Sequence, residues 1–168
     1  MAICPVSTGT DSSRITGGNP TIIGFYIPAG SPVIGVSTNT IQFYLKNDSS
    51  ISGTIACKYY ASSSDVGTSS FTDLGSMDAS TLTSFYVQYT FTGDSITLAE
   101  GNYIGIEYTA STSNVWMQVL NVANSNSIFF QYGAGTVTPV GSRTPNWCYE
   151  GAASSGTRLP PPPIVVHF

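Results

Sequence analysis

Residues 84–92 (SFYVQYTFT) give the clearest indication of the fold, because apolar and polar side chains alternate along them. Phe85, Val87, Tyr89 and Phe91 occupy every second position of this stretch. A period of two residues is typical of a β-strand that buries one face and leaves the other in water. The pattern therefore predicts a strand whose Phe85–Phe91 side faces a core.

Similar runs recur along the chain between clusters of Gly, Asn, Asp and Ser, whereas no window of a dozen residues keeps a helical apolar stripe. Strands are predicted at 21–27, 40–45, 53–60, 96–98, 103–109, 114–122, 127–132 and 146–150. Their spacing of roughly 8 to 15 residues is typical of sandwiches and jelly rolls, not of parallel α/β sheets. We therefore predict an all-β, antiparallel, jelly-roll-like β-sandwich.

The order of these runs also suggests local pairings and domain limits. The strands at 40–45 and 53–60 flank a polar turn at 47–50, which predicts a hairpin, and residues 71–82 are expected to be irregular. We divide the chain into an N-terminal arm at 1–20, a sandwich domain at 21–151 and a Pro-rich tail with a short β-prone end at 152–168.

Charge is scarce in this sequence. Charged residues make up 8% of the 168 positions, against about 25% in an average soluble domain. Ser and Thr together fill 44 positions, and the formal net charge is −4. The five Lys and Arg residues form no basic patch, so nucleic acid is not an expected partner. No apolar run approaches the ~18 residues of a membrane span, so a membrane is not expected either.

The first residues (MAICP) have neither a charged segment nor an apolar core of the kind found in signal peptides, so we expect no signal peptide. The composition, by contrast, is of an extracellular type. A virion protein that is made in the cytosol and released by lysis satisfies both observations.

The three cysteines, Cys4, Cys57 and Cys148, lack metal-ligand spacing, and the single histidine is His167, so a zinc site is not expected. Cys57 alternates with apolar residues and is expected to be buried and reduced. Cys4 stands beside Pro5 in the predicted arm, where we expect it to be exposed or linked to another chain. The state of Cys148 stays open.

Catalytic patterns are missing from the sequence. A Ser/His/Asp or Cys/His mechanism needs a histidine, and His167 lies in the tail; no Gly-x-Ser-x-Gly motif is present. Most carboxylates fall in predicted turns, where they cap backbone N–H groups, and Glu107 and Glu150 are expected on the solvent faces of strands. We therefore predict that the protein is not an enzyme.

Asp65, Asp73 and Asp78 are the only candidates for a structural calcium site, since they fall in one predicted loop region. They lack Asp-x-Asp spacing, and no other cofactor is expected. The Asp78 side chain is expected to cap the turn before Ser80, and Gly101 is expected at a turn that needs a positive φ.

The two tryptophans differ in their surroundings. Trp116 is out of phase with Val115, Met117 and Val119, so one of the two sets must face outward. If Trp116 does, it is a candidate for stacking on a glycan; the alternative is a place in the core or in a subunit contact. Trp147, beside Cys148, is expected in the core.

Part of the sequence resembles a known group of domains. The relevant residues are 41–45 (IQFYL), 53–55 (GTI), 77–82 (MDASTL), 89–91 (YTF) and 96–103 (ITLAEGNY). Their order resembles that of the choice-of-anchor or carbohydrate-binding-module-like β-sandwich domains found in phage structural and bacterial surface proteins. The resemblance covers about two thirds of the chain and implies a sandwich fold; its motifs are structural and imply no catalytic residues.

The tail supplies the main functional hint. Four consecutive prolines at 160–163 predict a polyproline II rod of about 12 Å. They are followed by Ile164, Val165, Val166 and Phe168, a β-prone apolar end. We predict that this end, together with Cys4, docks onto a neighbouring subunit by strand addition. The alternative is that the tail folds back over its own sandwich.

Two functions follow from these observations. The first is a structural protein of a virion surface, such as a phage or virus capsid decoration protein. It is expected to form homo-oligomers and to contact other virion proteins such as the major capsid protein. The second is a glycan-binding or adhesion module, secreted or on a cell surface or tail fibre.

Overall fold

The fold is an antiparallel β-sandwich, as predicted. The computed structural model describes residues 2–4, 11–16, 21–48, 50–109, 114–121 and 125–151. Among these, the only helical element is a single 3-10 turn, η1 (Ala79–Thr81). No helix in the described part of the chain is long and apolar enough to cross a membrane.

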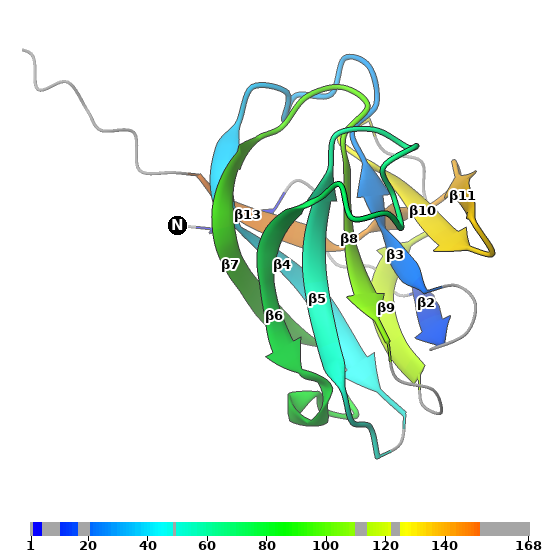
Figure 1. The fold of residues 1–168 in the computed structure, drawn as a ribbon. Coiled ribbons are helices and arrows are strands. Elements are labelled where there is room, and N and C mark those ends of the chain that lie inside the picture. Colours follow the sequence, from blue (N-terminus) through cyan, green and yellow to red (C-terminus); the bar gives the residue numbers. More distant parts are fainter. Residues whose placement is uncertain are drawn as a thin grey trace, which may run out of the picture.

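Two sheets form the sandwich (Figure 1). The seven-stranded sheet contains β1 (Ala2–Ile3), β2 (Asp11–Thr16), β4 (Ser37–Asn47), β7 (Val87–Thr97), β9 (Asn114–Leu120), β12 (Thr144–Pro145) and β13 (Trp147–Gly151). The six-stranded sheet has the order β11-β10-β3-β8-β5-β6, with β3 (Ile22–Tyr26), β5 (Thr54–Tyr60), β6 (Thr72–Asp78), β8 (Tyr103–Tyr108), β10 (Ile128–Gly133) and β11 (Thr136–Val140).

The main core lies between the sheets and is built from alternate residues of their strands. Ile41, Phe43 and Leu45 of β4 face it from one sheet, and Ile104 and Ile106 of β8 face it from the other, all fully buried. The predicted core faces of these strands are confirmed. Trp147 is also in this core, as expected, and its ring stacks on Phe25 with centroids 4.0 Å apart.

The predicted hairpin between 40–45 and 53–60 is wrong. β4 pairs with β7, β13 and β9 in one sheet, whereas β5 pairs with β6 and β8 in the other. Both strands carry an apolar face, and these faces meet across the sandwich rather than side by side. Burying both faces in one core outweighs the local pairing that the short polar turn favoured.

Two described parts of the predicted N-terminal arm, residues 2–3 and 11–16, belong to the seven-stranded sheet. β1 pairs with β13, and β2 pairs with β9 along its whole length, from Asp11 opposite Val119 to Thr16 opposite Asn114. These strands alternate too little to be predicted, because β1 has two residues and β2 is mostly polar. Pairing with a neighbouring strand, rather than apolar periodicity, defines them.

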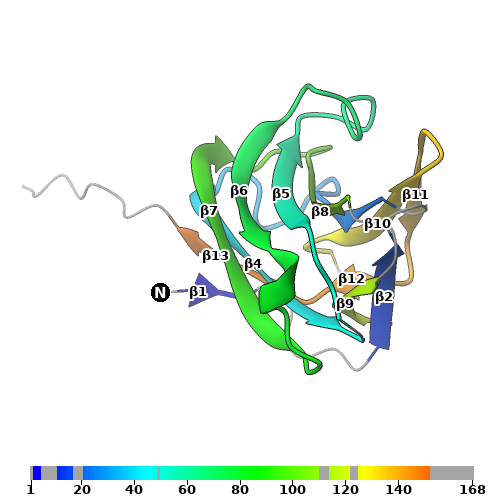
Figure 2. The same cartoon turned by 60° about the horizontal axis from the view of Figure 1, so that its bottom comes forward.

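The region between 71 and 97 also differs from prediction. Residues 72–78, expected to be irregular, form β6, and β7 runs without a break from Val87 to Thr97 through Gly93. Phe85 precedes β7 and is 77% exposed, so the predicted core face begins only at Tyr89 and Phe91. At Gly93 the backbone passes so close to β6 that a Cβ atom would lie 2.4 Å from the Asp73 carbonyl oxygen. This close approach brings β6 and β7 together where the two sheets meet (Figure 2).

Candidate functional site

The outer face of the six-stranded sheet carries a second layer of aromatic side chains. Tyr26 and Tyr103 lie on neighbouring strands and stack with ring centroids 5.3 Å apart. Phe130 meets the Tyr103 ring edge-on at 5.1 Å. The layer includes a small cluster of fully buried residues, among them Ile22 and Tyr60, which lies outside the main core.

Residues 61–71 run over this layer and cover part of it. Val66 from this loop is 3% exposed and packs against Tyr60, which is 1% exposed. At the edge of the covered region Lys58 forms an ion pair with Glu107, and the Lys58 ammonium lies 4.1 Å from the centre of the Phe71 ring. Glu107 is therefore on the outer face of its strand, as expected, but it is paired rather than free in water.

A cleft remains between this loop and the β10–β11 hairpin. Its volume is about 510 Å³, within the range of sites for small ligands. The loop contributes one wall, the hairpin contributes the other, and Tyr103 and Tyr132 contribute rings from β8 and β10. The lining residues are Ser63, Ser64, Val66, Thr68, Tyr103, Tyr132, Gly135, Thr136, Val137 and Pro139.

One glycine determines how closely the loop approaches the cleft wall. Gly67 has φ of 78°, and a Cβ atom at this position would lie 2.2 Å from the Tyr132 ring. Both the left-handed backbone and the contact with Tyr132 therefore require glycine. The Tyr132 ring is thus held against the loop backbone at one end of the cleft.

The cleft has a lining without acidic or basic side chains. No lining residue is a carboxylate, an amine or an imidazole. Burial, with a smaller contribution from Tyr26, raises the pKa of Tyr103, which stays neutral. The cleft therefore offers aromatic faces, apolar edges and hydroxyl groups to an uncharged ligand.

A second aromatic group lies on the outer face of the seven-stranded sheet. Val115, Met117 and Val119 point into the core, so Trp116 faces outward. This is one of the two orientations that the sequence left open. Its indole Nε1 donates to Asp48 Oδ2 at 3.0 Å, and the Lys46 ammonium lies 5.9 Å from its ring centre and 4.8 Å from that of Tyr86. Trp116 is half-buried beside a cation, which leaves part of its ring accessible.

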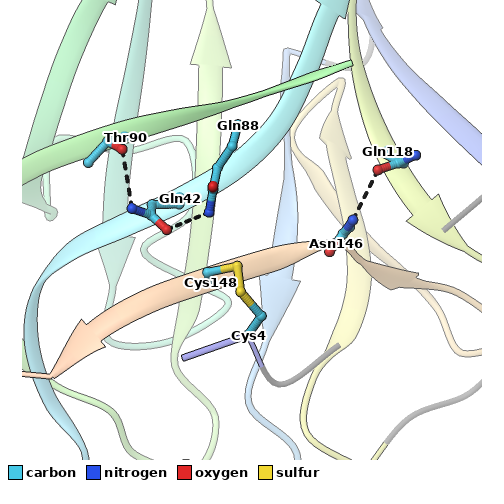
Figure 3. The surroundings of a disulfide bond; sticks show 7 residues. All are labelled: Cys4, Gln42, Gln88, Thr90, Gln118, Asn146 and Cys148. Atoms are coloured by element: carbon cyan, nitrogen blue, oxygen red, sulfur yellow. Dashed lines mark hydrogen bonds between the residues drawn. A yellow bond between two sulfur atoms is a disulfide. The ribbon is translucent and has the colours of Figure 1, made fainter. Parts of the chain in front are cut away.

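The same outer face carries the disulfide between Cys4 and Cys148 (Figure 3). Because Ile3 pairs with Tyr149, Cys4, the residue that follows β1, lies next to Cys148 of β13. Beside the disulfide, Gln42 donates to Thr90 Oγ1 at 3.3 Å and accepts from Gln88 Nε2 at 2.6 Å. A polar row thus extends across the sheet from the disulfide.

This disulfide corrects the expectation for Cys4. Cys4 is exposed, as predicted, but its sulfur is bonded within the chain, so it is not free for the predicted link to another subunit. The prediction failed because β1 has only two residues and gives no sequence signal of its pairing with β13. Cys148, left open from the sequence, is its partner, and Cys57 is buried and free, as expected.

The free thiol of Cys57 gives a direct chemical test. Complete burial, with a smaller contribution from the Asp73 charge, raises the pKa of Cys57 above its ordinary value. Because the thiolate is the reactive species, the native protein is expected not to react with iodoacetamide at pH 8, and one thiol should react after unfolding in urea. Rapid labelling of Cys57 in the native state, measured by mass spectrometry, would contradict this burial.

The three calcium candidates have separate local roles. Asp65 accepts from Ser62 Oγ at 2.7 Å, and Asp73 accepts from the Gly75 N–H at 2.8 Å. Asp78 accepts from the Ser80 N–H at 2.8 Å, which confirms the predicted cap and lowers the pKa of its carboxyl group. Within the described residues, no three His, Cys, Asp or Glu side chains are grouped as metal ligands.

The remaining predicted site residues, Ile164, Val165, Val166 and Phe168, lie outside the described residues. The cleft, by contrast, was not predicted as a site. Residues 133–135 (GAG) between two β-prone runs are a hairpin signal that could have located one of its walls. Its rings come from strands that are distant in sequence.

Comparisons with known proteins add no functional information for this fold. No family model matches the chain, and no curated protein or solved structure matches it significantly. The resemblance drawn from the sequence motifs therefore stays an expectation. The function must be argued from the surfaces of the molecule.

Proposed function

We propose that this chain is a non-enzymatic structural protein of a virion surface. It would serve as a capsid decoration protein or a similar component, in contact with other copies and with virion proteins such as the major capsid protein. The observation that carries the proposal is the separation of the described chain ends from the hairpin that borders the cleft. β1 and the end of β13 lie on one side of the sandwich, and the β10–β11 hairpin, which forms one wall of the cleft, lies on the other (Figures 1 and 2).

The first end is built from β1 and β13, which pair and are joined by the disulfide. Gly151 at the end of β13 leads into residues 152–168, which contain the predicted docking segment. A chain that leaves the domain from a strand fixed in this way can transmit an attachment force directly to the sheet. This arrangement supports attachment through the tail.

The disulfide and the surface composition support an extracellular location. Disulfides persist in oxidising surroundings such as virion surfaces and are rare in the cytosol. Charged residues are only 8% of the chain, and the cleft presents hydroxyl groups and rings. We therefore propose a virion surface as the site of action, with a secreted or cell-surface location as the alternative.

Deletion of residues 160–168 tests the proposal. The full chain is expected to co-sediment with purified particles of the virus that encodes it, and the truncated chain is expected to stay in the supernatant. Equal attachment of both chains would contradict docking through the tail. A truncated chain that melts well below the full chain would favour the alternative in which the tail folds back.

Glycan binding is the second candidate, favoured by the outward position of Trp116. If this face stacks on sugars, Trp116→Ala is expected to remove retention on immobilised glycans, since ring stacking needs the indole. Tyr44→Ala, a half-buried residue of the same outer face, is the matched control. Retention that survives Trp116→Ala would rule out Trp116 as the contact.

A further inference from the structure

The cleft on the six-stranded sheet has a restricted chemistry. Its rings, Tyr103 and Tyr132, and its apolar edges, Val66, Val137 and Pro139, favour contact with an apolar ligand. Its side-chain polar groups are hydroxyls, which can donate hydrogen bonds, and none carries a charge. The matching ligand is uncharged, has apolar faces and presents hydrogen-bond acceptors.

The chain itself contains such a ligand. The four prolines at 160–163 have no N–H groups, so this segment presents only ring faces and carbonyl acceptors. Because proline fixes φ, the segment loses little conformational entropy when it binds. Aromatic-lined grooves are a common binding site for segments of this kind.

We propose that the cleft of one copy binds the Pro160–Pro163 segment of a second copy. The proline rings pack on Tyr103 and Tyr132. Lining hydroxyl groups other than that of Thr68, which already donates to the Asp65 carbonyl, donate to the proline carbonyls. The proposal rests on the proposed function, because it names the surface to which the tail attaches. It also predicts that binding depends little on salt concentration, since no lining residue is charged.

The reach of the tail favours a second copy as the partner. The C-terminal end of β13 lies on the side of the sandwich away from the β10–β11 hairpin in both views (Figures 1 and 2). The nine Cα–Cα steps from Gly151 to Pro160 span at most about 31 Å when fully extended. A domain of this length has a diameter of about 38 Å. We therefore assign the contact to a second copy.

This contact would link copies head to tail. Each copy offers one cleft and one proline segment, which are different surfaces, so the interface is heterologous. Such interfaces close into rings or extend into open arrays. Both suit a protein that covers a particle surface.

The experiment uses the full-length chain as the receptor, with its four prolines replaced by alanine so that its own tail cannot compete with the peptide for the cleft. The substitutions are Pro160→Ala, Pro161→Ala, Pro162→Ala and Pro163→Ala. The receptor is isotopically labelled, and an unlabelled synthetic peptide of residues 156–168 is titrated into it. The amide chemical shifts of the receptor are measured by NMR. Saturable shifts are expected at Tyr132, Thr136 and Val137, around the cleft. A peptide with the four prolines replaced by alanine is expected to bind at least about fivefold more weakly.

Two variants of the receptor localise the binding. Thr136 is exposed on the cleft wall, so Thr136→Trp is expected to block the cleft without removing a core contact and to weaken binding at least about fivefold. Trp116→Ala, on the opposite sheet, is the control and is expected to bind normally. A second variant, Tyr132→Phe, retains the ring and is expected to bind at an affinity between those of the receptor and the Thr136→Trp variant.

Three results would overturn the proposal. The first is that the peptide causes no saturable shifts, and the second is that the shifts are confined to the β1–β13 edge. The third is that the cleft binds a neutral oligosaccharide such as cellohexaose but not the peptide. If the tail deletion still abolishes particle attachment in these cases, the tail docks elsewhere and the proposed function stands. If the deletion has no effect, the proposed attachment through the tail fails as well.

Discussion

Removal of the Cys4–Cys148 disulfide is expected to lower the free energy of unfolding by about 2–5 kcal/mol. The bond closes a loop of 144 residues, which is nearly the whole described domain. The constraint on the unfolded chain increases with loop length, so the effect should lie near the upper end of this range. Cys4 is exposed, and Cys4→Ser therefore removes the bond with little other change.

The measurement is urea unfolding of the oxidised chain, the reduced chain and the Cys4→Ser variant. The reduced chain and the variant are expected to have the same midpoint, below that of the oxidised chain. Adding a reductant to the variant is the control and should change nothing, because Cys57 is already free. Identical midpoints for the oxidised and reduced chains would show that the disulfide does not stabilise the fold.

Trp147→Ala is expected to cost about 3–5 kcal/mol, because it removes the largest fully buried side chain of the core. The indole stacks on Phe25, lies 5.7 Å from the Tyr149 ring and donates from Nε1 to Ser127 Oγ at 2.9 Å. The resulting cavity would lie in the main core between the two sheets. A fall in melting temperature of about 6–20 °C should accompany the change.

Trp147→Phe separates packing from hydrogen bonding. The smaller ring retains part of the contact with Phe25 but leaves the Ser127 hydroxyl without the indole donor. Its cost is expected to lie between those of the wild-type chain and Trp147→Ala, with about 1–3 kcal/mol arising from the lost hydrogen bond. A cost below 1 kcal/mol for Trp147→Ala, measured by calorimetry, would contradict the position of Trp147 in the core.

Strand identity and core faces were predictable where alternation is strong. Ile104 and Ile106 in β8, and Val115, Met117 and Val119 in β9, are buried on the side that the sequence pattern indicates. The burial of Cys57 was predictable from its alternation with apolar residues. The cap at Asp78 was predictable from the turn residues that follow it. Local periodicity and turn chemistry are sufficient for such features.

The candidate site was less accessible to sequence analysis. The cleft combines Tyr103, Tyr132 and a loop that contacts Tyr132 at Gly67, which are brought together by the order of strands in one sheet. Nothing in the separate segments indicates that they are neighbours. The sequence left open whether Trp116 or the set of Val115, Met117 and Val119 faces outward. The burial of that set shows that Trp116 does.

The sequence by itself determined the fold class, the faces of the longer strands, the low charge and the unusual tail. These depend on residue types and short-range spacing, which physics links directly to strands, turns and solvent exposure. Only the tertiary structure decided which strands pair, that β4 and β5 belong to opposite sheets, and that Cys4 meets Cys148. Strand pairing depends on contacts between residues as distant in sequence as Ala2 and Glu150, and many pairings satisfy the same alternation. The competition among them is resolved by burial of the whole core at once, which no single segment encodes.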